Sequence, residues 1–504
     1  MSHHLSEQEI IRRDKLNELK QLGIDPYPAA LYPVSHYSAD VKAAYTEETK
    51  EQFADVCLAG RIMSINDKGK VFFIKIQDNQ GIIQLYVKRD EICPDEDKTF
   101  FDKVIKHLID LGDIVGVTGY VFITKTGEIS VHAKTFTLLS KSLKPLPVVK
   151  RDEEGNVFDE VTDPEFRYRQ RYVDLIINPN VKETFAKRTL LVNTIRNFLN
   201  NQGALEIDTP VLQPIPGGAA ARPFITHHNA LDIPLYLRIA NELYLKRLIV
   251  GGFDWVYEFS RNFRNEGMDR THNPEFTILE WYTAYKDYHW MMDTTEELFE
   301  QLALALHGTT DVQVGENIIS FKAPFKRISI YGAIQEHTGI DVSSMNEDEL
   351  RAACKQLHIH TEDNMGKGKL IDAIFGEKAE GKYIQPTFII DYPVEMSPLT
   401  KKHRSKEGLV ERFELMINGK EIANAYSELN DPLDQRERFE EQARLMQRGD
   451  DEAMYIDNDF LRALEYGMPP TSGIGIGIDR LCMLMLNQPS IQDVLLFPQM
   501  RPES

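Results

Sequence analysis

At 504 residues the chain exceeds one ordinary domain, and its 42% hydrophobic content can fill two or three cores. A net charge of -20 argues against a general nucleic-acid-binding surface, although residues 1–150 are nearly neutral, with 20 Lys and Arg against 21 Asp and Glu. Four scattered cysteines exclude a disulfide framework and a Cys-x-x-Cys zinc site, and no apolar run has the length of a membrane span. We therefore expect a cytoplasmic protein with no membrane segment.

The N-terminus has the pattern of an amphipathic helix. Ser6 and Glu9 have the spacing of a capping box, and apolar residues then recur at helical intervals up to Gly23. The helix also carries four basic residues. Either they contact RNA, or they form a solvated face.

Residues 55–139 form short alternating segments separated by three glycine-containing turns, with one helical stretch near residues 100–111. Five strands with a helix after the third predict a small barrel of the oligonucleotide-binding (OB) type. Phe73 and Gln84 lie on neighbouring strands of this barrel, where an aromatic ring and an amide could read a single-stranded base. From the pattern alone, Phe73 is more often a core residue.

Two prolines at positions 145 and 147 indicate a linker, so we expect an N-terminal domain over residues 1–145. In the second domain, residues 146–504, strands and helices do not alternate regularly. An antiparallel sheet flanked by helices fits this order better than a doubly wound sheet, which makes the chain an α+β protein. Residues from about 328 to 381 are charged and helical, and we interpret them as a helical insertion.

A strand is predicted from Trp255, and alternation places Arg264 and Glu266 on one face where the chain turns at Gly267. The segment therefore presents a cation and a carboxylate at a strand end. Arginine binds phosphate through a planar, permanently charged group, which favours a nucleotide site.

A second segment places glycine at positions 473, 475 and 477 with isoleucine between them, and Arg480 follows at the start of a helix. Alternating glycines leave one strand face bare, so a flat ring or a phosphate could approach the backbone. Close packing of sheets is the alternative explanation. The Gly-x-Gly-x-x-Gly dinucleotide fingerprint is absent.

Glu414 and Glu421 flank Asn418-Gly419, a strong hairpin turn sequence. With these two residues as the turn, position 416 faces 421 and position 414 faces 423, which puts both glutamates on one face. A magnesium ion could bridge them beside a triphosphate, and a solvated acidic hairpin is the alternative. The adjacent residues His227 and His228 point to opposite strand faces, so they cannot chelate one zinc ion.

These segments together resemble the class II aminoacyl-tRNA synthetases, specifically the bacterial lysyl-tRNA synthetases. The three motifs of that family match residues 181–210, 255–285 and 473–485. Residues 227–232, 240–246 and 421–428 narrow the resemblance to the lysyl enzymes. It implies the class II synthetase fold, lysine, ATP and tRNA(Lys) as substrates, Mg²⁺ as cofactor, and a homodimer that packs through the first motif.

The resemblance assigns catalysis to the two arginines and to the glutamate pair, which is also the metal site. Arg264 would hold the substrate carboxylate and the α-phosphate, and Arg480 the γ-phosphate. The implied ATP-binding residues are Arg264, Glu266, His272, Asn273, Phe276, Glu414, Glu421 and Arg480, with Glu266 toward the adenine amino group and Phe276 stacked on its ring.

A lysine site needs two separated anions and one cation. The resemblance gives the α-ammonium to Glu242 and the backbone near Gly218, the carboxylate to Arg264, and the ε-ammonium to Glu428 with Tyr282. Asn424 and Tyr426 complete the implied site. They share a strand face with Glu428, but Glu421 has the opposite parity. A β-bulge near Ala423 would bring all four residues to one face.

The resemblance makes Phe73, Gln84 and Glu128 the anticodon-binding residues. A paralogous ligase that lysylates a translation factor would lack the barrel. A non-catalytic RNA-binding or amino-acid-sensing protein on the same scaffold should have lost the arginines or the glutamate pair, and this sequence retains them.

Overall fold

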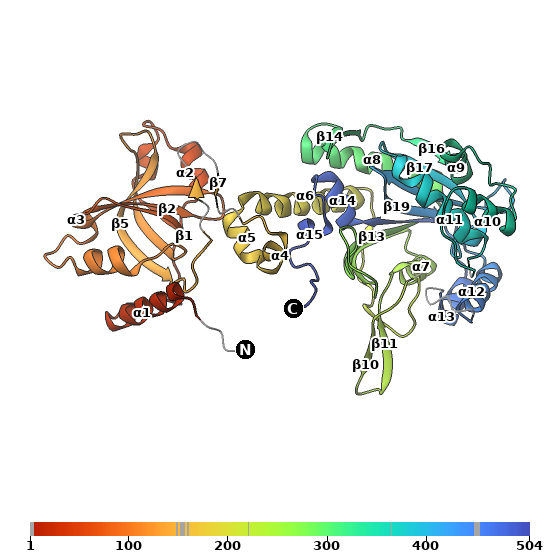
Figure 1. Ribbon diagram of the computed structural model, residues 1–504, viewed down its shortest axis with the longest axis horizontal. Coiled ribbons are helices and arrows are strands. Elements are labelled where there is room, and N and C mark those ends of the chain that lie inside the picture. The colour runs from red at the N-terminus through yellow and green to blue at the C-terminus, as the bar shows by residue number, and fades with distance from the viewer. Residues whose placement is uncertain are drawn as a thin grey trace. The chain divides into compact units, whose positions relative to one another are not determined.

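The computed structural model describes residues 5–147, 150–151, 157–158, 161–219, 221–363, 365–447 and 454–503. It divides into two compact units, residues 1–161 and 162–504 (Figure 1). The sequence places the domain boundary at residue 145 instead. Among the described residues, no helix combines the length and the apolar character needed to cross a membrane.

The first unit is built on a closed five-stranded barrel, which confirms the predicted OB-type domain. The strand order is β1-β2-β3-β5-β4, and both predicted hairpin turns between β1, β2 and β3 are present. A π-helix, Phe100–Leu108, lies between β3 and β4. The strands are β1 Val56–Asp67, β2 Val71–Gln77, β3 Ile82–Lys88, β4 Ile114–Ile123 and β5 Ile129–Ser140.

The predicted N-terminal helix is α1, Glu7–Gln21, and Ser6 with Glu9 forms its capping box. One of its basic residues, Arg12, is buried and donates to the carbonyls of Leu111 and Ser142. Arg12 therefore holds the helix against the rest of the unit. Small elements complete the unit: α2 Ser38–Ala44, the 3-10 turn Lys50–Phe53, α3 Arg89–Ile92, β6 Lys150–Arg151 and β7 Val157–Phe158.

The second unit contains an eight-stranded, mostly antiparallel sheet flanked by helices, as predicted. Its order is β16-β17-β18-β19-β20-β13-β12-β8, with parallel pairing only at the two edges. The strands are β16 Lys326–Ser329, β17 Thr387–Pro393, β18 Leu409–Ile417, β19 Lys420–Ser427, β20 Thr471–Gly477, β13 Glu275–Ala284, β12 Trp255–Phe263 and β8 Leu205–Glu206.

One face of this sheet is closed by the main hydrophobic core. Ile474 and Ile476 of β20 pack there with residues of three helices: α6 Pro179–Asn201, α8 Tyr288–His307 and α14 Ile478–Met485. On the other face, Val256 and Tyr282 pack with α7 Glu242–Val250 and α13 Asn458–Glu465. Because side chains alternate along each strand, the second face is free to carry polar groups.

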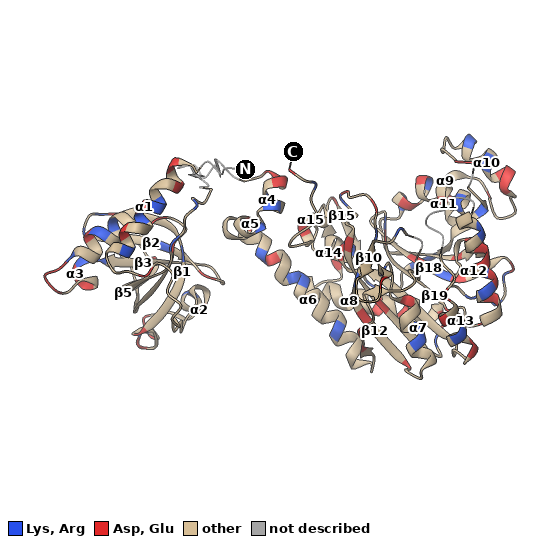
Figure 2. Ribbon diagram, turned by 90° about the horizontal axis from the view of Figure 1, so that it is seen from below, with Lys and Arg blue, Asp and Glu red and all other residues tan. Residues whose placement is uncertain are grey.

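Three helices lie between β16 and β17, where the sequence indicates an insertion: α9 Ile330–Thr338, α10 Glu347–Gln356 and α11 Lys367–Lys378. They share a hydrophobic core that includes Ile389 and Met416. Figure 2 shows that acidic and basic residues alternate along the ribbon of α12, Pro432–Gln447, and that basic residues recur along α6.

The remaining elements connect these layers. They are α4 Pro164–Arg169, α5 Arg171–Ile177, β9 Leu212–Gln213, β10 Ile225–His228, β11 Ile233–Leu237, β14 Asp311–Val314, β15 Asn317–Ser320, α15 Ile491–Val494 and the 3-10 turns Glu380–Lys382 and Val394–Met396.

Candidate active site

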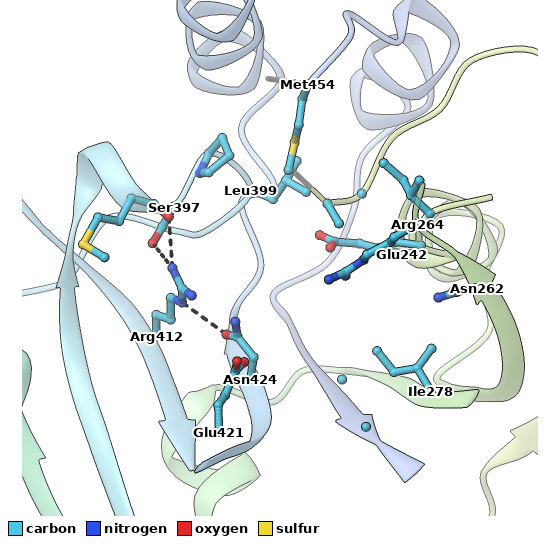
Figure 3. Close-up of a pocket in the computed structure, with 18 of the residues that line it drawn as sticks. Glu242, Asn262, Arg264, Ile278, Ser397, Leu399, Arg412, Glu421, Asn424 and Met454 are labelled. Atoms are coloured by element: carbon cyan, nitrogen blue, oxygen red, sulfur yellow. Dashed lines mark hydrogen bonds between the residues drawn. The ribbon is translucent and has the colours of Figure 1, made fainter. Parts of the chain in front are cut away.

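A cavity of about 850 Å³ opens on the second face of the large sheet. Most of the residues that the resemblance assigns to ATP and lysine line it. They are Gly218, Glu242, Arg264, Glu266, His272, Asn273, Phe276, Tyr282, Glu421, Asn424, Tyr426 and Arg480. Figure 3 shows Glu242 and Arg264 on one side of this cavity and Glu421, Asn424 and Arg412 on the other. These twelve predicted residues therefore meet in one place. Glu414 and Glu428 are not among the lining residues, but Glu414 pairs with Asn424 and Glu428 lies beside Gly473, both of which line the cavity.

The glycine strand β20 forms part of the cavity wall, and its isoleucines face the core as predicted. A Cβ on Gly473 would lie 2.2 Å from Glu428 Oε1 and 2.3 Å from the Tyr282 ring, so only glycine fits. At Gly477 the nearest atom would be 3.8 Å away, on Arg480. The strand is therefore bare for two reasons: sterics within the protein at Gly473 and open space at Gly477.

The hairpin β18–β19 brings the two predicted metal-binding glutamates together, with a change of register. Met416 faces Glu421, as predicted, but Glu414 faces Asn424 and not Ala423. The extra residue is Ile422, which forms a bulge between these pairs. The prediction of the 414–423 pair is therefore wrong because it assumes a regular ladder, whereas the predicted bulge is confirmed.

As expected, the bulge changes which side chains of β19 share a face of the strand. Ile422 and Ala423 both join the main core, so the alternation restarts after them. Glu421, Asn424 and Tyr426 all line the cavity. A single inserted residue thus places Glu421 on the same strand face as Asn424 and Tyr426.

Arg264 and Arg480 lie within electrostatic reach of each other at one end of the cavity. The Arg264 guanidinium lies 5.1 Å from the centre of the Phe276 ring. Burial lowers its pKa, and the neighbouring charge of Arg480 acts in the same direction, while Glu266 and Glu421 oppose them. Two cations this close favour a multiply charged anion between them.

His272 is tied to Arg480. Nη2 of Arg480 lies 3.0 Å from Nε2 of His272, and Nδ1 of His272 lies 2.8 Å from Asp269. A guanidinium only donates, so Nε2 is the acceptor and Nδ1 carries the proton toward Asp269. Asn273 is anchored differently, since its Oδ1 accepts from the Gln499 backbone.

Burial, together with the smaller effect of the charge of Glu414, raises the pKa of Glu421 to about 7, although three nearby arginines lower it. Two like charges on neighbouring strands are stabilised by a bound cation. No group of three or more His, Cys, Asp or Glu residues forms a metal-ligand set in the described part of the chain. The pair fits an ion that takes its other ligands from substrate phosphates.

At the other end of the cavity, carboxylates and tyrosines are paired inside the protein. Tyr426 donates to Glu242 Oε2 at 2.8 Å, and Tyr282 donates to Glu280 Oε2 at 3.0 Å. Glu428 is only 2% exposed and lies under Gly473. Tyr282 and Glu428 are therefore close together, but the hydroxyl of Tyr282 engages Glu280.

The sequence analysis does not predict four further residues of this site. Glu280 and Asn262 lie two residues before Tyr282 and Arg264 on the same strand faces, and Asn262 is buried with neither amide atom hydrogen-bonded. Arg412 lies two residues before Glu414 and donates to it at 2.5 Å. Lys246 follows Glu242 by one helical turn. Each lies two strand positions or one helical turn from a predicted residue and therefore shares its face. That spacing is the pattern from which the sequence could have identified these four residues.

In the barrel, Phe73 faces Tyr86 across the β2–β3 ladder, with ring centres 5.4 Å apart. Both rings are partly exposed, so Phe73 is not a core residue. Gln84 donates to Ser130, whose hydroxyl donates in turn to the carbonyl of Glu128. Phe73, Gln84 and Glu128 therefore lie on adjoining parts of the outer barrel surface.

Models of known protein families match both units of the chain. Residues 163–501 match the model for class II tRNA synthetases (D, K and N), and residues 56–139 match the model for the OB-fold nucleic-acid-binding domain. The chain belongs to the class II tRNA synthetases.

Its relatives share nearly the full length. A lysine–tRNA ligase of Porphyromonas gingivalis is 65% identical over 99% of this chain and 86% of its own. Proteins of the same name from Christiangramia forsetii and Azobacteroides pseudotrichonymphae are 63% and 61% identical, and the match covers 87% and 99% of their lengths.

Burial, together with the smaller effect of the charge of Glu242, raises the pKa of Glu280 from 4.5 to about 8. Glu280 therefore stabilises the fold below pH 4.5, and this contribution is lost as the pH rises through 8. We expect Glu280→Gln to gain stability relative to the parent by up to about 1.4 kcal/mol per pH unit over that window. Urea unfolding of both ligand-free proteins from pH 5 to 8.5 measures this. Parallel stability curves would contradict the assignment.

Proposed function

We propose that this protein is a lysine–tRNA ligase, which activates L-lysine with ATP and transfers it to the 3′ end of tRNA(Lys). The observation that carries the proposal is one cavity whose lining includes Arg264, Arg480, Glu421 and Glu242, with Glu414 and Glu428 directly beside lining residues. The full-length relatives named lysine–tRNA ligase support the same activity.

In the first step, the lysine carboxylate attacks the α-phosphorus of ATP, the bond to the bridging oxygen breaks, and pyrophosphate leaves. Arg264 lies where it can orient that carboxylate and stabilise the α-phosphate, while Arg480 reaches the triphosphate from α14. In the second step, a hydroxyl of the terminal adenosine attacks the lysyl carbonyl and AMP leaves. Neither step needs a protein nucleophile, so catalysis depends on placement and charge.

Glu414 and Glu421 would hold Mg²⁺, because their carboxylates share one sheet face and the charge of one raises the pKa of the other. The bound ion would neutralise the triphosphate and fix its shape. Arg412 also contacts Glu414 and donates to Asn424 at 3.1 Å, so it holds the hairpin face in register.

Glu242 and Glu428 supply the anionic groups of the lysine end, with Glu242 proposed to bind the α-ammonium. Gly218 has a φ of +85° beside Ala240, and a Cβ there would approach within 2.9 Å, so glycine keeps the backbone near Glu242 accessible. In the barrel, Phe73, Gln84 and Glu128 are proposed to bind the anticodon by stacking and edge hydrogen bonds. The four free cysteines are compatible with a cytoplasmic location, which belongs to the same proposal.

We also propose a homodimer that forms through α6 and the segments after it. Several large apolar side chains of these segments are exposed: Leu190, Leu205, Leu212, Ile225 and Leu231, with exposed fractions from 45% to 68%. A group of this kind is typical of an interface between copies.

Lysine should be the only one of the twenty standard amino acids to support ATP–pyrophosphate exchange. Ornithine should be about 10 to 200-fold poorer, because it lacks one methylene. Norleucine should be about 10⁴-fold poorer, since it leaves Glu428 unpaired. Charging of tRNA(Lys) separates this enzyme from a ligase that lysylates a translation factor. Exchange without any transfer to tRNA would contradict the proposal, as would the absence of exchange.

Arg264→Ala should lower lysine-dependent exchange by at least about 100 to 1000-fold, because it removes the cation at the reacting carboxylate and phosphate. Arg261→Ala is the matched control, since that arginine lies on the same strand and is half exposed. Exchange by Arg264→Ala within about tenfold of the parent would refute its catalytic role.

Leu190→Glu should shift the protein from dimer to monomer in sedimentation velocity, because a charge would be buried in the interface. Leu304→Glu alters an equally exposed leucine on α8 and should leave the dimer intact. A monomeric parent, or a dimer unaffected by Leu190→Glu, would count against this interface.

A further inference from the structure

An ammonium group of the protein itself lies inside the proposed lysine pocket. Lys246 is completely buried on α7, and its Nζ forms ion pairs with Glu242 Oε1 and Glu428 Oε2. The rings of Tyr426 and Phe460 lie 5.5 and 6.0 Å from the same nitrogen. Lys246 thus bridges the two carboxylates that are proposed to bind the two ammonium groups of the substrate.

The bridge leaves one oxygen of each carboxylate available to other partners. Glu242 Oε2 accepts from Tyr426, whereas neither oxygen of Glu428 has a hydrogen-bond donor in the described part of the chain, and Oε2 is held by its ion pair with Lys246. Oε1 is buried 2.2 Å from where a Cβ of Gly473 would be, and Gly473 itself lines the cavity. Glu428 is therefore held through Oε2, and its Oε1 lies directly behind the bare backbone of the cavity wall.

The charges of the pocket balance only when Lys246 is included. Glu242, Glu280 and Glu428 are buried carboxylates, and Lys246 is the cation between two of them. When all three carboxylates are ionised, three anions and one cation leave two negative charges, which equals the number of ammonium groups on lysine. Bound lysine would thus draw the proton from Glu280, whose pKa burial raises to about 8 in the ligand-free protein. The substrate carboxylate is assigned separately to Arg264. Because unpaired charges are costly in a buried site, this count favours a ligand that presents two cationic groups to the pocket.

We propose that Lys246 is a positioning residue for lysine recognition: it keeps Glu242 and Glu428 as anions and aims Glu428 Oε1 at the ε-ammonium of the substrate. This inference rests on the proposed lysine–tRNA ligase function. Without the Lys246 ammonium, the closely spaced carboxylates repel each other, so one of them takes up a proton and loses its affinity for an ammonium.

The test uses the full-length enzyme and compares Lys246→Met and Lys246→Gln with the parent in ATP–pyrophosphate exchange. Glutamine keeps a hydrogen-bond donor at this position but carries no charge. We expect the KM for lysine to rise about 100-fold in both variants, because a buried charge pair is broken. The KM for ATP should change less than about threefold, and the pH at which kcat/KM for lysine reaches its plateau should rise.

Chemical rescue separates charge from packing. Lys246→Ala lacks the atoms from Cγ to Nζ, which correspond to propylammonium. Added propylammonium should lower the raised KM for lysine most of the way to the parent value, whereas the neutral isostere 1-propanol should leave it raised. An unchanged KM for lysine in Lys246→Gln, or equal rescue by both compounds, would overturn the inference. If the parent itself shows no lysine-dependent exchange, the proposed function fails instead.

Discussion

The dominant constraint on this structure is the burial of like-charged carboxylates on one face of a β-sheet. Glu242, Glu280 and Glu428 lie within a few percent of complete burial, and burial raises the pKa of Glu280 and of Glu428. A protein gains nothing in stability from such a cluster, since each carboxylate is removed from water. We therefore interpret the cluster as part of the proposed lysine site, and the fold must supply the cations, the hydroxyl groups and the empty space that stabilise it.

Helix α7 supplies the cation, Lys246, and the sheet supplies the hydroxyl groups and the space through local departures from regular geometry. The bulge at Ile422 turns three polar side chains of β19 toward the cavity and keeps Ala423 and Ala425 in the core. The missing side chain at Gly473 makes room for the carboxylate of Glu428 and the ring of Tyr282. Both departures would weaken an ordinary strand, because they cost ladder hydrogen bonds or conformational freedom. The large core on the opposite face stabilises the sheet against them.

The sequence predicts well whatever depends on periodicity. The barrel, the antiparallel sheet, α1 with its capping box and the glycine strand all follow from alternation, spacing and turn residues. It predicts pairing less well, because Glu414 faces Asn424 only once a bulge is counted. The bulge itself could be inferred from a conflict of parity in β19, but its position could not. Contacts between distant segments, such as Lys246 with Glu428, depend on how α7 packs, which no local pattern encodes. The resemblance to a known family supplied most of the assigned roles.

The individual placement of arginines also explains how the chain can have an acidic composition. An enzyme that binds ATP and tRNA is expected to be rich in exposed cations, yet the second unit is strongly acidic. The arginines of the proposed nucleotide site are placed individually: Arg264 against Phe276, Arg480 against His272 and Glu421, and Arg412 against Glu414. Each cation is held by an anion or a ring, so together they produce no basic patch on the surface. Affinity for phosphate then comes from geometry inside a cavity of low dielectric constant, where a charge acts strongly over a short distance. The negative exterior limits nonspecific binding of RNA, and the nearly neutral barrel unit remains free to make specific contacts with bases.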